Sequence, residues 1–114
     1  MSLYVANIVL YVKYSDGNQN NYPIWENIVL IETSSEEEAF EKAEKIGKES
    51  NGDCFFWEDR EAVWEYAGIR KLLEVDNIND LKNGVEITFS QMLLESKSDL
   101  NKFTAGDEVK VIYG

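Results

Sequence analysis

Apolar and polar residues alternate over residues 3–14, which is the pattern of a β-strand with one face toward a core. The apolar or aromatic side chains occupy every second position: Tyr4, Ala6, Ile8, Leu10, Val12 and Tyr14. The following SDGNQNN consists of turn formers, and Asp16-Gly17 can supply the positive φ angles of a tight turn. Residues 22–32 are again rich in apolar side chains. The pattern predicts a β-hairpin that joins 3–14 to 22–32.

Residues 34–47 carry the pattern of a capped amphipathic helix. Ser34 and Ser35 are each followed three residues later by a glutamate, so either serine can open a capping box. The acidic first turn also suits the positive end of the helix dipole. We expect Gly47 or Gly52 to end the helix, because glycine is the favoured residue at a helix C-terminus.

The apolar residues of this helix form a narrow stripe of mostly small side chains. They recur at spacings of three and four: Ala39, Phe40, Ala43 and Ile46. Such a stripe favours close packing on a sheet over a helical bundle. We expect the Phe40 ring to be buried, so that Phe40→Ala would lower the free energy of unfolding by about 3 kcal/mol.

Two further apolar runs, at residues 54–57 and 62–75, predict two more strands. In the longer run the apolar phase shifts, because Trp64 and Tyr66 share one face and the apolar residues after Gly68 share the other. These later residues are Ile69, Leu73 and Val75. A β-bulge near Gly68 would bring both sets to a common core face, since an interior glycine often marks such a bulge.

The C-terminal third of the chain predicts a second hairpin. Residues 76–84 have the composition of a turn, and residues 85–94 continue as a strand. The apolar side chains of this strand alternate with polar ones: Val85, Ile87 and Phe89. Residues 95–107, rich in Ser, Asp, Asn and Lys, are typical of a loop or a frayed strand end, and 108–113 form a last short strand.

Together these elements predict one domain over residues 1–114, of the α+β class. The expected fold is a twisted antiparallel sheet of five to six strands built from hairpins, with one amphipathic helix packed on one face. A single helix covers only one face of such a sheet. Trp25, Val29 and Ile31 indicate that the second face is not simply polar, so we expect it to be curled on itself or covered by a partner.

Four aromatic residues are candidates for a protein interface, because aromatic side chains dominate binding hot spots. They are Trp25, Trp57, Trp64 and Tyr66. The same side chains are equally suited to a hydrophobic core. We place the interface across the sheet from the helix, around the strand that includes Trp64.

The chain has 22 acidic and 11 basic residues and a formal net charge of -11. This charge opposes binding to phosphate backbones, so nucleic acid is not expected as a ligand. It would speed the encounter with a basic protein, although it also serves solubility alone. An alternative function is therefore that of an acidic inhibitor or immunity-type protein, which would neutralise a basic toxin or nuclease through Glu36–Glu44 or Asp53–Glu65.

Candidate catalytic groups are sparse. The chain has no histidine, the side chain that most often performs general acid and base catalysis near neutral pH. The single cysteine, Cys54, precedes three aromatic residues and is expected to be a small buried hydrophobe rather than a nucleophile. An enzyme would have to rest on carboxylates such as Glu65, Glu86 and Glu108, with or without a metal. We expect no catalytic residue, metal site, cofactor or small-molecule ligand.

Residues 1–14 lack a basic leader and form an apolar run too short to span a bilayer. A single cysteine fits a reducing compartment. We expect a cytoplasmic protein without membrane contact.

Three segments of the chain carry a family pattern: ENIVLIETSSEEEAFEKAEKIGKES, VWEYAGIRKLLEV and NGVEITFSQML. The features that carry it are Glu38-Ala39, Lys42-Ala43, Gly47, Trp64 and Gly84-Val85-Glu86. In these features the chain resembles a bacterial family known as domain of unknown function 4288. The resemblance implies a strand hairpin, a capped helix, a Trp-containing strand and a Gly-x-Glu hairpin, together with a bacterial origin, and it implies no activity.

The residues and the resemblance lead to one expected function. We expect a small non-enzymatic protein that acts through contact with another protein or with itself, as in a homodimer.

Overall fold

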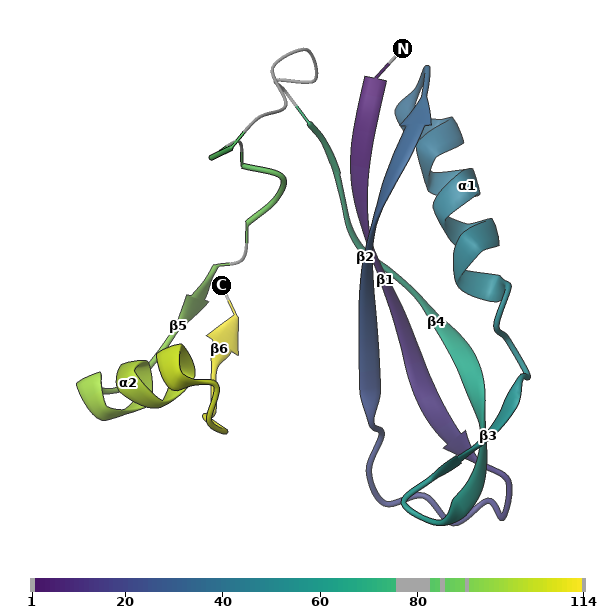
Figure 1. Ribbon diagram of the computed structural model, residues 1–114, viewed down its shortest axis with the longest axis vertical. Helices are drawn as coiled ribbons and strands as arrows, with labels where there is room; N and C mark the ends of the chain where they lie inside the picture. The colour runs from purple at the N-terminus through teal and green to yellow at the C-terminus, as the bar shows by residue number, and fades with distance from the viewer. Residues whose placement is uncertain (1, 76–82, 85, 90, 114) are drawn as a thin grey trace.

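The computed structural model describes residues 2–75, 83–84, 86–89 and 91–113 (Figure 1). The elements follow one another in this order: β1 (Ser2–Tyr14), β2 (Ile24–Thr33), α1 (Glu36–Lys48), β3 (Cys54–Trp57), β4 (Arg60–Glu74), β5 (Met92–Leu93), α2 (Lys97–Ala105) and β6 (Ile112–Tyr113). A four-stranded antiparallel sheet has the order β2-β1-β4-β3, and β5 pairs with β6 in a two-stranded sheet. The α+β class and the antiparallel sheet are confirmed.

The predicted hairpin of 3–14 and 22–32 is confirmed. β1 pairs with β2 in an unbroken register from Ser2 opposite Thr33 to Tyr11 opposite Ile24. β1 also pairs with β4 on its other side, so β1 lies inside the sheet between β2 and β4. Its even-numbered side chains, which the alternation predicted to be apolar, are buried: Tyr4, Ala6, Ile8, Leu10, Val12 and Tyr14.

α1 begins with the predicted serine cap. Ser35 is the capping residue, and its hydroxyl accepts a hydrogen bond from the Glu38 N–H at 3.2 Å. The Glu38 carboxylate accepts from the Thr33 hydroxyl at 2.7 Å, and this bond, with a second from Ser34, holds the pKa of Glu38 below its usual range. The helix start is thereby tied to the end of β2.

Neither predicted glycine ends α1. The helix continues through Gly47 to Lys48, and its C-cap is Glu49 in a right-handed helical conformation. Gly47 serves packing instead, because a Cβ atom there would lie 2.6 Å from the Tyr66 ring and 2.8 Å from Ile8 Cγ2. Ala39, Ala43 and Gly47 are the buried residues of α1, at a spacing of four. The helix therefore approaches the sheet as closely as small side chains allow.

The prediction that the Phe40 ring is buried is wrong. Phe40 is 44% exposed and Ile46 is 39% exposed. The close contact made by Ala39, Ala43 and Gly47 leaves no depth for a large side chain, so these two side chains lie on opposite flanks of the helix.

Phe40→Ala is therefore expected to cost about 1 kcal/mol, a third of the value expected for a buried ring. Urea unfolding followed by tryptophan fluorescence measures the difference, with Glu41→Ala as a control for any general effect on α1. A loss of 3 kcal/mol or more would mean that the ring is part of the core after all.

The main core lies between α1 and the sheet (Figure 1). Its buried members are Tyr4, Ala6, Ile8, Ile31, Ala39 and Ala43. The sheet extends beyond the C-terminal end of α1, and a second cluster lies there on β1, β3 and β4. This second cluster comprises Val12, Tyr14, Ala62, Phe55, Trp57 and Trp64.

The predicted irregularity near Gly68 is confirmed, and it is double. Opposite β1, the register of β4 shifts between Asn7 and Ile8 and again between Val9 and Leu10, so that Arg70 and Ala67 are the extra residues of two bulges. Gly68 lies between these two residues with φ of 154°. Each extra residue inverts the alternation, so Ile69 and Leu72 pack on the main core. Leu73 and Val75, which were predicted for the core face, lie on the opposite face of the sheet.

The prediction for the C-terminal part is largely wrong. Residues 97–105 form the helix α2 instead of a loop, so the described chain has two helices rather than one. The Ser96 hydroxyl caps α2 by accepting from the Asp99 N–H at 3.0 Å, and Gly106 ends it with φ of 85°. Residues 86–89 form no strand, and the last strand is confined to Ile112–Tyr113. The predicted turn at 76–82 and the strand residue Val85 lie outside the described residues.

Candidate interaction surface

The two faces of the four-stranded sheet are covered to different degrees. α1 lies along one face, called here the helix face, whereas the opposite face, called the outer face, is turned toward β5, α2 and β6 in Figure 1. The register places the odd-numbered residues of β1 on the outer face with their cross-strand partners from β2, which are Ile24, Glu26, Ile28, Leu30 and Glu32. Our assignment of Trp25, Val29 and Ile31 to the uncovered face is wrong, because all three pair with even-numbered residues of β1 on the helix face, and Val29 and Ile31 pack on the main core.

The phase of β2 could not be read from its sequence, because residues 28–31 are apolar without interruption. Residues on both faces therefore look equally suited to a core. Only the pairing with β1 shows that the exposed set contains the even-numbered residues.

An apolar patch follows β2 on the outer face. We call this set the outer patch: Tyr22, Ile24, Ile28 and Leu30. Each of its side chains is between 56% and 60% exposed. Tyr22 is held there by an edge-to-face contact with Tyr11, at 5.6 Å between ring centroids. β2 is an edge strand, so this patch also borders the open side of the sheet.

Polar groups occupy the middle of the outer face. Arg70 forms an ion pair with Glu26, with Nη2 at 3.1 Å from Oε1 and a second bond from Nε to Oε2. Since these residues lie on β4 and β2, the pair crosses the central strand β1. Asn7 is buried on β1 between Ile28 and Lys71 in the register, and its Oδ1 accepts no hydrogen bond from the described part of the chain.

The ion pair with Arg70, which is the largest cause, lowers the pKa of Glu26. A carboxyl with a lowered pKa in the folded state contributes stability above its unfolded pKa of about 4.3, and this contribution is lost as the pH falls through the folded pKa. We therefore expect Glu26→Gln to lower the free energy of unfolding by about 0.5 kcal/mol at neutral pH, the usual value for an exposed pair.

The difference from the wild type should shrink as the pH is lowered from about 7 to about 3, because protonation of the Glu26 carboxyl in the folded state removes this contribution. Urea unfolding at the two pH values tests this. Glu32→Gln is the matched control, since it lies on the same strand and forms no ion pair that the structure describes. An equal loss at both pH values would show that the carboxylate acts by shape rather than charge.

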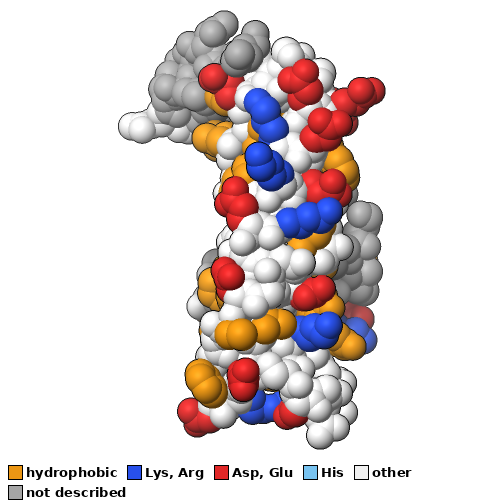
Figure 2. Space-filling model, turned by 90° about the vertical axis from the view of Figure 1, so that its right-hand side faces the viewer, with side chains coloured by type: hydrophobic (Ala, Val, Ile, Leu, Met, Phe, Trp, Pro, Cys, Tyr) orange, Lys and Arg blue, Asp and Glu red, His pale blue; other side chains and the backbone are white. Residues whose placement is uncertain are grey.

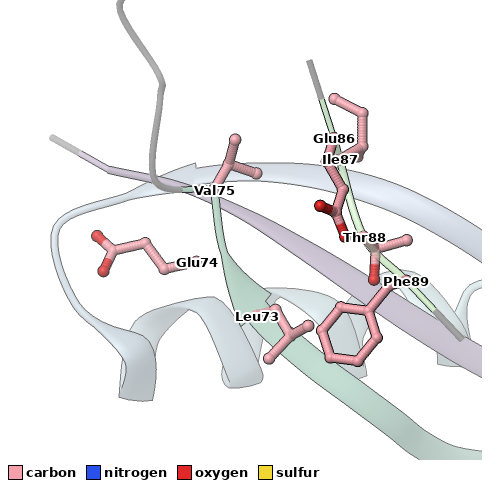
Figure 3. Close-up of a pocket in the computed structure, with 7 residues that line it drawn as sticks. All are labelled: Leu73, Glu74, Val75, Glu86, Ile87, Thr88 and Phe89. Atoms are coloured by element: carbon pink, nitrogen blue, oxygen red, sulfur yellow. The ribbon is translucent and has the colours of Figure 1, made fainter. Parts of the chain in front are cut away.

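A pocket of about 310 Å³ lies at the end of β4 on the outer face, and its residues are drawn in Figure 3: Leu73, Glu74, Val75, Glu86, Ile87, Thr88 and Phe89. The Phe89 ring lies beside Leu73, whereas the Glu74 side chain points away from the segment 86–89. Lys71 fastens this segment to the sheet, because its Nζ donates to the Phe89 carbonyl and lies 4.0 Å from the centre of the Phe89 ring. The segment expected as a hairpin strand is thus a cover over part of the outer face.

The carboxylates considered for catalysis do not meet in this pocket. Of Glu65, Glu86 and Glu108, only Glu86 lines it. Within residues 2–75, 83–84, 86–89 and 91–113, no three His, Cys, Asp or Glu side chains are arranged to hold a metal ion. The three carboxylates considered for catalysis therefore do not converge in this pocket.

The four aromatic candidates divide into two groups. Trp25 and Trp64 meet edge to face at 5.9 Å, and Trp64 also stacks on Phe55 at 4.5 Å. Trp57 packs on the same cluster beyond the end of α1. Tyr66 lies apart from them under Gly47 of α1. Trp64 and Tyr66 are therefore on the helix face, and our placement of their strand across the sheet from the helix is wrong. Trp25 is the exposed member of the group, on the edge strand β2.

Cys54 is exposed, contrary to our prediction of a buried position. β3 alternates, so that Phe55 and Trp57 turn toward the aromatic cluster and Cys54 and Phe56 turn outward. The aromatic run around the cysteine is continuous, and for this reason it did not reveal which positions point inward.

The acidic residues proposed for binding a basic protein lie on a mixed surface. Figure 2 looks onto the side of the molecule that carries α1, and it shows acidic and basic side chains interleaved. Lys48 lies 4.0 Å from Glu44, and Lys42 Nζ donates to the Glu32 carbonyl at 3.1 Å. Binding of a basic toxin through Glu36–Glu44 or Asp53–Glu65 stays a prediction.

The fold and the surface describe a small α+β protein with one helix-covered sheet face and a partly open outer face. The chain belongs to the family of the domain of unknown function DUF4288, whose model matches residues 3–89. The match covers the sheet, α1 and the segment 86–89, and it ends before β5. No curated protein and no solved structure gives a significant match. Neither helix that the structure describes is long and apolar enough to cross a bilayer.

Proposed function

We propose that this protein is a small non-enzymatic cytoplasmic protein that acts through protein–protein contact, and that β2 and its outer patch make the contact. The observation that carries the proposal is the exposure of Tyr22, Ile24, Ile28 and Leu30 along one edge strand. Exposed apolar side chains gathered on one strand are typical of interaction sites, since water contact is unfavourable for each of them.

Burial of the outer patch would contribute favourably to such a contact. Complete burial of an Ile or Leu side chain contributes about 1.5–3 kcal/mol relative to full exposure, so each half-exposed side chain has about 1 kcal/mol still to gain. Trp25 lies on the helix face of the same strand and adds an exposed aromatic side chain of the type enriched in hot spots. The ion pair of Glu26 with Arg70 lies between Ile24 and Ile28 and adds a polar group within the surface.

A photo-crosslinking amino acid at position 30 tests the proposal. The matched control carries the same amino acid at position 41, which is exposed on α1 and outside the patch. Both proteins are irradiated alone and in an extract of the source cells. We expect a crosslinked protein product from position 30 that is weak or absent from position 41. Equal yields from the two positions, or none from position 30, would overturn the proposal.

A further inference from the structure

β2 has an open hydrogen-bonding edge whose direction can be derived from its pairing with β1. The Val12 N–H donates to the Pro23 carbonyl at 3.0 Å. Because the bonds of an antiparallel ladder alternate, the odd-numbered residues of β2 bond to β1, and the even-numbered residues point their N–H and C=O groups away from the sheet. Lys42 Nζ donates to the carbonyl of Glu32, an even-numbered residue, which agrees with this alternation.

Over residues 24–30 this edge lacks the features that usually protect an edge strand, whereas the Glu32 carbonyl at its end accepts from Lys42 Nζ. Natural edges are short, bulged, or guarded by Lys or Pro, because an open edge pairs readily with another strand. β2 has 10 residues in unbroken register with β1, whereas β3 at the other edge has 4. Pro23 precedes β2, and the only charged residues within the strand are Glu26 and Glu32. The open N–H and C=O groups of a strand of this length can pair with another strand.

We infer that β2 of a second copy covers this edge, antiparallel about a twofold axis at Ile28. This inference rests on the proposed function, and it names the partner of the same surface. A twofold axis normal to the sheet allows two registers with nearly full overlap, centred on Ile28 or on Val29. The register centred on Val29 places Glu26 opposite Glu32 twice, and like charges directly opposite each other are destabilising. The register centred on Ile28 places Glu26 opposite Leu30 and leaves no such pair.

A pocket on the helix face supports the same register. It has a volume of about 350 Å³ and lies between α1 and the end of β2, with Ile31, Lys42, Lys45 and Ile46 in its lining. With the axis at Ile28, Trp25 of the second copy lies opposite Ile31, beside this pocket. The half-exposed Trp25 of one copy and the partly exposed Ile46 of the other then cover each other across the pair of β2 strands. Lys42 and Lys45 lie beside the indole ring. On the outer face, the two patches join at Ile28.

Cysteine crosslinking tests the register in a Cys54→Ser background, which removes the only native thiol. In this register the two Ile28 residues form a hydrogen-bonded pair with Cα atoms about 5.5 Å apart, within disulfide range. The matched control is Leu30→Cys, because Leu30 is equally exposed on the same face. In this register Leu30 lies opposite Glu26 of the second copy, which is four residues, or about 13 Å along the strand, from Leu30 of that copy. Val29→Cys reports the rejected register.

We expect mild oxidation to give a covalent dimer from Ile28→Cys roughly tenfold faster than from Leu30→Cys or Val29→Cys. Sedimentation of the unmodified protein should give a mass of two chains, and Ile28→Lys should return it to one chain with an unchanged thermal unfolding when both are dilute. A faster reaction at position 29, or equal rates at all three, would overturn the inference.

The two proposals fail in different ways. If the wild type sediments as one chain at high concentration while position 30 crosslinks to a different protein, protein contact stands and self-pairing falls. If position 30 crosslinks to the chain's own α2, which exposes Leu100 and Phe103, self-pairing also falls. If it crosslinks to nothing, both proposals fall.

Discussion

Ile8→Ala is expected to lower the free energy of unfolding by about 3–4 kcal/mol, the largest loss at any single position considered for this chain. Ile8 is 1% exposed, lies on the central strand, and packs against both α1 and β4. Removal of its side chain leaves a cavity between a helix and a sheet, and the close helix contact at Gly47 limits how far the two can collapse into it. Urea unfolding followed by fluorescence of the three tryptophans measures the loss.

The matched control for this prediction is Ile46→Ala, which makes the same chemical change at a side chain that is 39% exposed on α1. We expect it to cost about 1 kcal/mol. A difference of less than 1 kcal/mol between the two variants would contradict the packing described for the core. Since domains of this size unfold with a free energy of about 5–15 kcal/mol, the loss at Ile8 is a large share of the total.

Gly47→Ala is expected to destabilise the protein by about 1–3 kcal/mol, although the same change in an exposed helix stabilises by about 1 kcal/mol. The sign is reversed because the new Cβ would lie 2.6 Å from two atoms of the Tyr66 ring and 2.8 Å from Ile8 Cγ2. These distances are too short for carbon atoms that are not bonded to each other, so the Tyr66 ring, the helix or both would have to move. Thermal unfolding monitored by circular dichroism gives the sign directly.

A double-mutant cycle with Tyr66→Ala separates crowding from helix propensity. In the Tyr66→Ala background, the ring no longer opposes the new methyl group, and Gly47→Ala should cost less than it does in the wild type or become stabilising. Lys45→Ala, on the exposed side of α1, controls for the general effect of alanine. If Gly47→Ala raised the stability of the wild-type protein, the close approach of α1 to the sheet would be disproved.

The local elements with short-range signals could be predicted. The alternation over 3–14, the turn at Asp16-Gly17 and the serine cap of α1 each depend on residues within a few positions of one another. The irregularity at Gly68 could also be predicted, because the apolar phase changes within one strand. The α2 helix was missed although its cap signals, Ser96 with Asp99 and Gly106, are present in the sequence. These signals were overlooked because residues 95–107 are mostly polar and have the composition of a loop.

The candidate site could be predicted only in part. Trp25 and Trp64 were named and do meet, since both are large enough to reach each other across β1 from β2 and β4. The outer patch was missed, because Ile24, Ile28 and Leu30 cannot be distinguished by type from Trp25, Val29 and Ile31 on the same strand. The segment 86–89 has the alternation of a strand, but Lys71 and Leu73 hold it over the outer face instead.

Residue order alone was enough to establish the α+β class, the first hairpin, the cap of α1 and a net charge of -11. These properties depend on composition and on neighbours in the chain. The exposed face of β2, the depth of Phe40 and the outward turn of Cys54 depended on pairing and packing between distant segments. A strand that is apolar on both faces is compatible with either orientation in the sheet. Only the position of α1, which packs through its small residues, makes one face of β2 part of the core and leaves the other exposed.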